Sequence, residues 1–267
     1  MNKLRQPPIF NISETDFLVD IDKQVLRQTN DLNNEISFIK DMTDRGTHYR
    51  LFYDPARKNI PRYSYEKGTL LEITVPKLSA LDPEGMSEKY RIPVGELPGK
   101  TDFEVIVDQR ALYQRLNGIL PQLDLAGEQF AVDLRNHELR HSRNSYEVIS
   151  LKSFDISNDG WHFEAYYHPV MKKVVEIDPK LLEFPESVIK IRIPNEIGLD
   201  PVGAARQYGI DERELLRRHP IQVILKAEII PLSETNIPGM IQRNKEALKQ
   251  EHRENMQRAK PRIRPRF

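Results

Sequence analysis

The feature that most constrains the fold of this chain is a sequence that occurs twice. LDPEGMSEKYRI begins at Leu81, and LDPVGAARQYGI begins at Leu199. Two further pairs follow the same order along the chain: FLVDIDKQVLR with FAVDLRNHELR, and LLEITVP with VIKIRIP. Colinear matches at a nearly constant offset predict a tandem duplication, with one copy at residues 1–120 and a second at 128–237. Copies of this length have the size of ordinary domains and are too long for solenoid repeats.

Each copy is predicted to contain several strands and one helix. HYRLFYD and HFEAYYH place aromatic residues at alternate positions, and LLEITVP and VIKIRIP alternate apolar with polar residues before a proline. These patterns are typical of half-buried strands. FEVIVD, from Phe103, and IQVILKAEII, from Ile221, have a similar composition, so we expect strands there too. The predicted fold class is therefore α+β with a mainly antiparallel sheet.

The repeated LDP sequence predicts the one helix of each copy. Asp82 and Asp200 stand where an N-cap residue belongs, because an aspartate side chain accepts hydrogen bonds from the first free N–H groups of a helix. Pro83 and Pro201 follow at the first helical position, where proline is tolerated because that N–H is unbonded anyway. We expect this capped helix to connect the last two strands of each copy.

Composition narrows the class of protein and its compartment. The 267 residues include no cysteine, which excludes disulfides, thiol catalysis and Cys-ligated zinc and favours a reducing environment. The longest apolar runs, such as LLEITV, are far too short to span a bilayer, and the first residues lack the apolar run of a signal peptide. We therefore expect a cytoplasmic protein with no membrane association.

Charge is unevenly distributed along the chain. The formal net charge is zero, but nine Lys/Arg against three acidic residues give residues 243–267 a net charge of +6, so the rest of the chain carries −6. Residues 238–267 are predicted to form a basic arm that is helical at first and extended in KPRIRPRF, where prolines separate the cations. The partner-binding residues expected on this arm are Arg243, Lys245, Lys249, Arg253, Arg258, Lys260, Arg262, Arg264 and Arg266.

The arm has two interpretations. It has good helix formers, but Ile241, Leu248 and Met256 do not make a continuous apolar face, so a solvated tail is one of them. The other is a segment that binds an anionic partner. Arg and Lys that neutralise phosphates bind nucleic acid without sequence preference and with strong salt dependence. An acidic protein surface, including that of a neighbouring subunit in an oligomer or assembly, would suit the same charges.

A second candidate for nucleic-acid contact is VGAARQYGIDERELLRR, from Val202. Gly209 stands where the turn of a helix-turn-helix would lie, and Arg213, Arg217 and Arg218 would then reach phosphates or base edges. A helix that ends at a glycine C-cap and is followed by a short second helix accounts for the same residues. The first copy has Arg91 at the turn position, which favours this simpler interpretation.

A third basic patch is RNHELRHSRN, from Arg135. Arg140 and Arg143 are the residues there that would contact phosphates. The corresponding segment of the first copy, DKQVLRQTND, contains no histidine. A solvated loop is the alternative interpretation of this patch.

Two histidines raise a metal-dependent alternative. Strand alternation places His162, Glu164 and His168 on one face, and imidazole and carboxylate groups suit zinc or iron. The first copy has Arg50 at the position of Glu164, and the two histidines are too far apart along a strand to share one ion. Structural histidines are the simpler interpretation, so no metal site and no cofactor are predicted.

No common catalytic motif occurs in the sequence: there is no G-x-G-x-x-G, Walker loop, G-x-S-x-G or H-E-x-x-H. We therefore predict a non-catalytic binding or scaffold protein whose basic arm engages an anionic partner, with nucleic acid as the first expectation. Two alternatives stay open. One is a structural subunit that docks its arm on a neighbouring subunit, and the other is a metal-dependent hydrolase that uses His162, Glu164 and His168.

Overall fold

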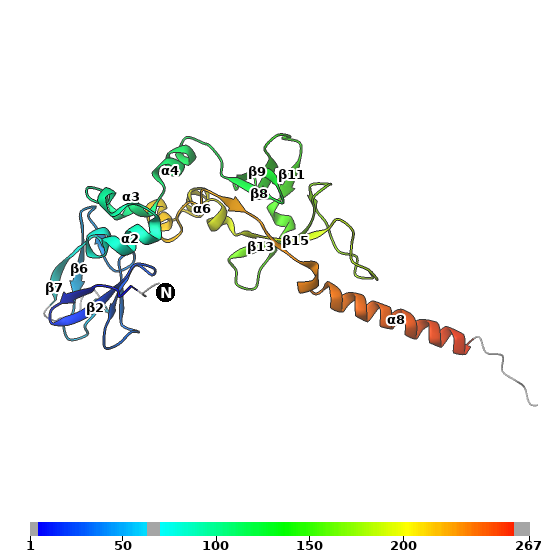
Figure 1. The fold of residues 1–267 in the computed structure, drawn as a ribbon, viewed down its shortest axis with the longest axis horizontal. Coiled ribbons are helices and arrows are strands. Elements are labelled where there is room, and N and C mark those ends of the chain that lie inside the picture. The colour runs from blue at the N-terminus through cyan, green and yellow to red at the C-terminus, as the bar shows by residue number, and fades with distance from the viewer. Residues whose placement is uncertain (1–4, 63–69, 259–267) are drawn as a thin grey trace, which may run out of the picture. The chain divides into compact units, whose positions relative to one another are not determined.

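In the computed structural model, which describes residues 5–62 and 70–258, the chain divides into two compact units (Figure 1). Unit 1 consists of residues 1–118 and 208–221, and unit 2 of residues 119–207 and 222–267. Both units combine antiparallel sheets with helices, which confirms the α+β class. The repeat boundaries at 1–120 and 128–237 remain a prediction.

Unit 1 contains two antiparallel sheets. The first has the strand order β1 (Ile9–Ile12), β2 (Thr15–Asp20), β3 (Val25–Gln28), β4 (Glu35–Ser37), and the second β5 (Thr43–Asp44), β6 (His48–Tyr53), β7 (Leu71–Pro76). Alternate residues of β2 and β6 are buried, among them Phe17, Val19, Tyr49 and Tyr53. This alternation is that of strands with one face on a core, as the sequence predicts.

Six short helices complete unit 1. They are α1 (Leu78–Leu81), α2 (Pro83–Tyr90), the 3-10 helix η1 (Val94–Glu96), α3 (Asp102–Ile106), α4 (Gln109–Leu116) and α7 (Glu212–Arg218). Helix α7 comes from the second half of the sequence, yet it belongs to unit 1. Its residues Leu215, Leu216 and Arg217 are buried there.

Unit 2 contains two larger sheets. One has the order β11 (Val148–Ser150), β10 (Glu138–His141), β9 (Glu128–Asp133), β8 (Gln122–Leu125), β16 (Leu225–Lys226). The other has the order β12 (Asp155–Ile156), β13 (His162–His168), β15 (Ile189–Pro194), β17 (Glu228–Ile230), with β14 (Lys173–Val174) beside β13. Strands β16 and β8 pair in parallel, whereas the other strand pairs of the described residues are antiparallel. Mainly antiparallel pairing is therefore confirmed.

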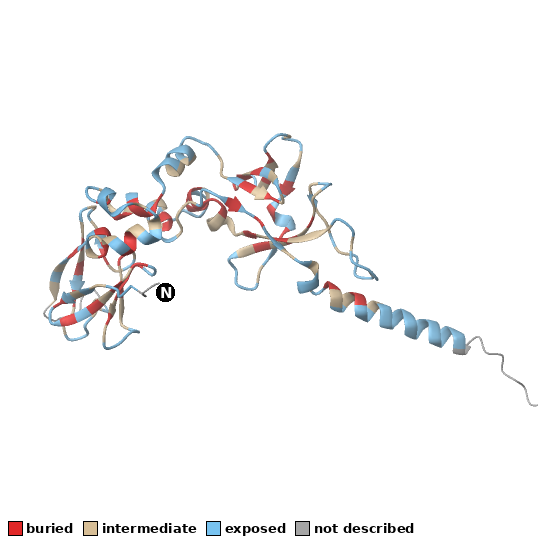
Figure 2. Cartoon of the chain, viewed as in Figure 1, coloured by how far each residue is buried: buried red, intermediate tan, exposed pale blue. Residues whose placement is uncertain are grey.

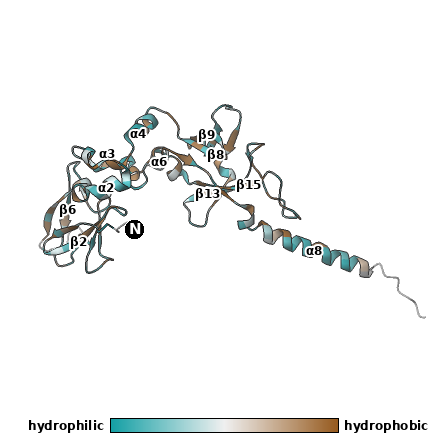
Figure 3. Ribbon diagram, in the orientation of Figure 1, coloured by the Kyte–Doolittle hydropathy of each residue, from teal (hydrophilic) through white to brown (hydrophobic). Residues whose placement is uncertain are grey.

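Apart from α7, the helices of the second half are short except for the last. They are η2 (Leu151–Ser153), α5 (Glu196–Leu199), α6 (Pro201–Tyr208), η3 (Leu232–Glu234) and α8 (Ile237–Arg258). Buried residues gather in the strands and the short helices, whereas most of α8 is exposed (Figure 2). The exposed part of α8 is also mainly hydrophilic (Figure 3). Within residues 5–62 and 70–258, no helix is both long and apolar enough to cross a membrane.

The helix starts predicted from the LDP sequence are confirmed. Asp82 accepts a hydrogen bond from the backbone N–H of Gly85 at 2.9 Å, and Pro83 begins α2. Asp200 accepts from the N–H of Gly203 at 3.0 Å at the start of α6. The Asp–Pro pairs in the sequence therefore correctly predict where both helices begin.

Two predictions about the neighbouring segments are wrong. FEVIVD is not a strand: Asp102–Ile106 is helix α3, and Asp108 caps α4. Thr101 begins α3 with a capping box, in which its hydroxyl accepts from the N–H of Glu104 and the Glu104 carboxylate accepts from the Thr101 N–H. This reciprocal cap outweighs the strand propensity of Phe, Val and Ile.

The expectation of one helix per copy is also wrong, since each capped helix follows a second short helix and further helices follow in unit 1. IQVILKAEII forms strands only at β16 and β17.

Candidate functional site

The first turns of α8 are fixed to unit 2. Ile237 and Ile241 are buried, and the Asn244 side chain donates hydrogen bonds to the backbone oxygens of Pro179 at 2.8 Å and Leu181 at 2.9 Å. These contacts all lie on the N-terminal part of the helix. From residue 245 to residue 256 every residue is exposed.

Three cations on this exposed part form a straight row. Lys245, Lys249 and Arg253 are each four residues apart, so they lie on one face of α8 and are spaced by about 6 Å along its axis. Across the part of the chain that the structure describes, none of the three has an ion pair with a carboxylate. We call these three residues the basic row. Arg243 is exposed as well but lies off this row.

Two of the three carboxylates between residues 245 and 256 are bonded elsewhere on the helix. Glu246 accepts a hydrogen bond from the Gln242 side chain at 3.1 Å, and Glu254 accepts one from Gln250 at 3.2 Å. These four residues form their own line, again with a spacing of four. The basic row is therefore free to neutralise negative charge on a partner.

The remaining cations of the predicted arm lie at or beyond the end of α8. Arg258 is the last residue of α8, and nothing is described of its side chain. Lys260, Arg262, Arg264 and Arg266 lie outside the described residues.

The arginines of α7 are bonded within unit 1. The guanidinium of Arg217 is 4% exposed and contacts Asp44 and the side chain of Gln24, at 3.5 Å and 3.2 Å. It also lies 5.2 Å from the centroid of the Tyr49 ring. Arg213 stacks over a ring in α3 and pairs with Asp44 at 3.5 Å, and Arg218 pairs with a glutamate one turn earlier in α7.

The segment 202–218 contains the helix, turn and helix that the sequence indicates. Helix α6 ends at Tyr208, Gly209 has φ +65°, and α7 begins at Glu212. A left-handed glycine after the last helical residue is the geometry of a glycine C-cap. Because Arg217 is buried, its side chain is not presented for contact with a nucleic acid in this conformation.

The basic patch at residues 135–144 is divided between bonded and free cations. Arg140 pairs with Glu138 at 2.5 Å and with Asp133 at 3.4 Å. Arg143 is exposed, and no hydrogen bond or ion pair connects it to another described residue. His141 is buried, so it forms part of the interior of unit 2.

Glu164, the central residue of the metal hypothesis, is held by cations. It accepts from Lys190 at 2.5 Å and from Arg192 at 2.7 and 2.8 Å. Hydrogen bonds from Lys190 and then Arg192 keep the pKa of Glu164 below its ordinary value. His162 faces Asp159 at 3.0 Å, and His168 accepts from the N–H of Met171. In residues 5–62 and 70–258 no group of three or more His, Asp or Glu is arranged to hold a metal ion.

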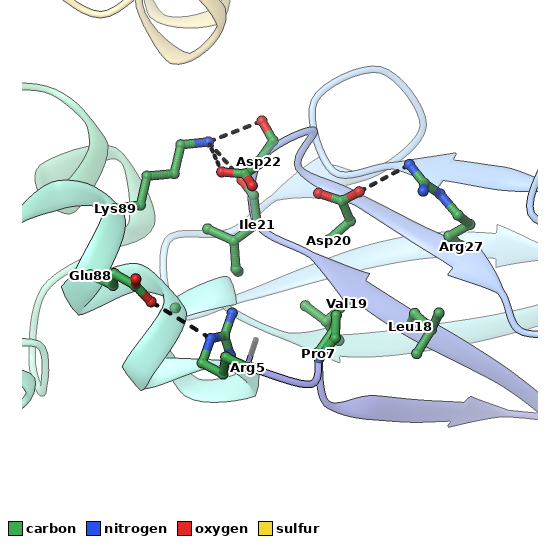
Figure 4. Close-up of a pocket in the computed structure, with 11 residues that line it drawn as sticks. Arg5, Pro7, Leu18, Val19, Asp20, Ile21, Asp22, Arg27, Glu88 and Lys89 are labelled. Atoms are coloured by element: carbon green, nitrogen blue, oxygen red, sulfur yellow. Dashed lines mark hydrogen bonds and ion pairs between the residues drawn. The ribbon is translucent and has the colours of Figure 1, made fainter. Parts of the chain in front are cut away.

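A pocket of about 750 Å³ lies between α2 and the first sheet of unit 1 (Figure 4). Lys89 reaches across it to the backbone oxygens of Ile21 and Asp22, at 2.9 and 3.0 Å. Arg27, on the opposite wall, pairs with Asp20 at 2.9 Å. The cations that line the pocket are thus already paired with the protein, which leaves few groups to select a charged ligand.

One cluster in unit 2 could not be found from the sequence. His141, Glu128, Glu147 and Lys172 meet there although they lie far apart along the chain. The only sequence signal is that His141 belongs to the histidine-containing patch. Which carboxylates and which lysine surround it follows from strand pairing.

Comparisons with protein-family models, curated proteins and solved structures give no significant match.

Proposed function

We propose that this chain is a non-catalytic binding protein that engages a polyanion, nucleic acid in particular, through the basic row on α8. The observation that carries the proposal is the arrangement of Lys245, Lys249 and Arg253 on one helix face, all exposed and all without a carboxylate partner among the described residues. Cations that contact phosphates release the counterions condensed on a nucleic acid, and this release drives binding.

The exposure of α8 also supports the proposal that this helix binds a partner. Residues 245–256 gain no burial from the described part of the chain. An isolated helix of this length is marginally stable in water, so contact with a partner would stabilise it. We include the exposed Arg243 and Arg143 as secondary contacts and leave Arg217 out, because its guanidinium is bonded inside unit 1.

Fluorescence anisotropy of labelled DNA and RNA tests the proposal on the full chain. A triple substitution of Lys245, Lys249 and Arg253 to Gln removes the basic row. The slope of log K against log salt is negative, and each lost phosphate contact makes it less steep by about 0.9 for duplex DNA. We therefore expect the steepness of the slope to decrease by about 3 and binding at low salt to weaken at least tenfold.

The matched control removes three positive charges elsewhere. Lys40, Lys152 and Lys173 are exposed and lie outside α8, so their triple substitution to Gln changes net charge by the same amount. If both triple variants bind alike, general charge and not the basic row is responsible. If the unsubstituted chain binds neither nucleic acid, the proposal fails and an acidic surface of a protein assembly becomes the partner to test.

We also propose that the two halves arose by tandem duplication. The four strands β1–β4 and the four strands β8–β11 have the same lengths and the same spacing, since each residue range is shifted by 113. Strands β6 and β7 correspond to β13 and β15, and α1 and α2 correspond to α5 and α6. Both LDP aspartates cap their helices with the same hydrogen bond.

A reversed ion pair adds support for this origin. On β6 and β7, Arg50 pairs with Glu72. At the matching positions of β13 and β15, Glu164 pairs with Lys190. The same cross-strand contact with exchanged charges is what compensating substitution after duplication would produce. Arg50 in place of Glu164 is then a charge exchange and does not mark a lost metal ligand.

We further propose a cytoplasmic location, which the cysteine-free sequence supports.

A further inference from the structure

The ammonium group of Lys172 lies among three side chains of unit 2. Its Nζ is 3.2 Å from the Glu147 carboxylate, 3.4 Å from Nε2 of His141 and 3.7 Å from the Glu128 carboxylate. Lys172 precedes β14 and has a left-handed backbone, with φ +50°. The residues around it come from β9, from the end of β10 and from the loop that follows β10.

His141 is fixed at the centre of this cluster. It is 5% exposed, its Nδ1 accepts the backbone N–H of Asn144 at 3.1 Å, and its Nε2 lies 2.9 Å from Glu128. Because Nδ1 accepts, Nε2 carries the proton that is donated to Glu128. The ring therefore holds the loop 141–147 and β9 together, and Lys172 adds the β13–β14 turn.

The matching place in unit 1 is built from neutral groups. Gln28 and Asn34 stand where unit 2 has His141 and Glu147, at the same shift of 113. The Asn34 amide donates to Gln28 Oε1 at 2.7 Å and to the backbone oxygen of Lys58 at 2.9 Å. Lys58 also has a left-handed backbone, φ +55°, but its side chain is exposed. In unit 1 the loop is thus bound to the turn by an amide and not by the lysine charge.

We propose that Lys172 is a built-in counter-cation that latches the loop 141–147 to the β13–β14 turn, and that this ionic latch opens when its charge is removed or screened. Glu128 and Glu147 bring two negative charges to this place, and the ammonium of Lys172 between them offsets their repulsion. Unit 1 performs the same closure without charge, so its loop is expected to be insensitive to the same change.

The charges around the latch agree with this role. The groups that face it are Glu128, His141, Arg143, Glu147, Tyr167 and Lys172. The hydrogen bond from His141 and the charge of Lys172 lower the pKa of Glu128. Burial raises the pKa of Glu147, but the hydrogen bonds from Asn144 and Lys172 together with nearby charge outweigh it, so this pKa lies below its ordinary value. Burial, with both carboxylates nearby, raises the pKa of Tyr167 to about 12, so its hydroxyl stays protonated at neutral pH.

The direction of the pH dependence follows from the two carboxylates. Their pKa values lie below the ordinary value of 4.5 in the folded protein. The latch is therefore complete above about pH 4.5 and is lost as pH falls through the lowered values.

Amide hydrogen exchange of the full chain at neutral pH tests the latch. In Lys172→Met, which keeps an unbranched apolar side chain of similar size but removes the ammonium, we expect exchange in the loop 141–147 to rise about five- to tenfold, because partly buried charge networks exceed single surface pairs. Lys172→Arg keeps the charge and should retain most of the protection. Lys58→Met is the matched control and should leave the loop 28–34 unchanged.

Chemical rescue separates charge from packing. Methylammonium added to Lys172→Met should restore protection of the loop 141–147 and should have no such effect on the unsubstituted chain. Loss of protection without rescue would assign Lys172 a packing role and overturn the latch, as would unchanged protection in Lys172→Met. If Lys172→Met does not fold, the proposal is tested by measuring amide hydrogen exchange of the unsubstituted chain at increasing sodium chloride concentration. The loop 141–147 should lose protection with salt and the loop 28–34 should not, and equal responses contradict the proposal.

Discussion

Arg217 is a buried charged residue that connects several polar groups of unit 1. Its guanidinium contacts Gln24, Asp44 and Tyr49, and the backbone oxygen of Arg217 also accepts a hydrogen bond from Gln24 at 3.0 Å. Tyr49 in turn donates to the buried Asp102 at 2.7 Å. Burial raises the pKa of Tyr49 well above its ordinary value, so this donor stays protonated. A chain of polar contacts therefore runs through the core of unit 1.

Replacing Arg217 by Leu should lower the free energy of unfolding by about 2–3 kcal/mol, because it leaves the charge of Asp44 without one of its partners in a largely buried place. Urea denaturation measures the change. Arg218→Leu is the control in the same helix: its guanidinium is 35% exposed and, among the described residues, pairs with Glu214 one turn away, which predicts a loss of less than about 1 kcal/mol. Equal losses would mean that the network adds nothing to stability.

Residue-level reasoning from the sequence succeeds where the interaction is local. Asp82 and Asp200 are correctly identified as caps because their partners are three residues away. Arg217 contacts residues 173 and 193 positions distant, and Lys172 meets carboxylates on other strands. No sequence period links such positions, so neither the buried arginine nor the latch can be derived before the strands are paired.

Helix α2 depends on a close contact at its first turn. A Cβ added at Gly85 would overlap the carboxylate of Asp82 and the guanidinium of Arg5. These two groups are themselves an ion pair at 2.5 Å, and Asp82 is the N-cap of the helix. A side chain at position 85 would therefore displace the Asp82 carboxylate and the Arg5 guanidinium.

Gly85→Ala should lower the free energy of unfolding by about 1–3 kcal/mol, because the cap and the arginine must move apart to admit a methyl group. Gly95→Ala is the matched control, since nothing lies within 4 Å of a Cβ there and its φ is not left-handed. It should stay within about 1 kcal/mol of the unsubstituted protein. Thermal or urea unfolding measures the free energy of unfolding of both variants. Equal stability of the two would show that the close contact at Gly85 has no effect on stability.

At the level of elements, strand alternation predicts most of the sheet correctly and fails where tertiary contacts dominate. FEVIVD has the composition of a strand, but Asp102, the residue immediately before it, accepts hydrogen bonds from the N–H groups of Leu78 and Ser79 at 2.7 and 3.0 Å. One side chain thus caps α1 while its own segment forms α3. Such a contact overrides a propensity that amounts to less than about 1 kcal/mol per residue.

At the level of the whole molecule, the chain passes between its two units three times. Residues 1–118 enter unit 1, residues 119–207 form unit 2, residues 208–221 return to unit 1, and the rest belongs to unit 2. The duplication that the sequence indicates would by itself predict two consecutive domains. The sequence does not predict the return of α7 to unit 1, because its buried residues, Leu215, Leu216 and Arg217, have the pattern of the apolar side and the end of any short helix.

Because α7 belongs to unit 1, we expect the two fragments of a chain cut between its halves to stay associated. A protease site inserted between Gly118 and Ile119 would yield two fragments, and the second would still contain α7. Because Leu215 and Leu216 are buried in unit 1 at 6% and 1% exposure, we expect the fragments to elute together in size-exclusion chromatography and to separate only in denaturant. A buried leucine contributes about 2–3 kcal/mol, so exposing Leu215 and Leu216 together with the Arg217 network opposes separation of the fragments.

Leu216→Asp in the cut chain is the control, since it places an unpaired charge in this buried site and should release the fragments. Separation of the unsubstituted cut chain under native conditions would show that unit 1 is complete without α7. Co-elution that survives Leu216→Asp would place the attachment outside α7. Release by this one substitution would establish that a helix from the second half of the sequence completes the core of the first.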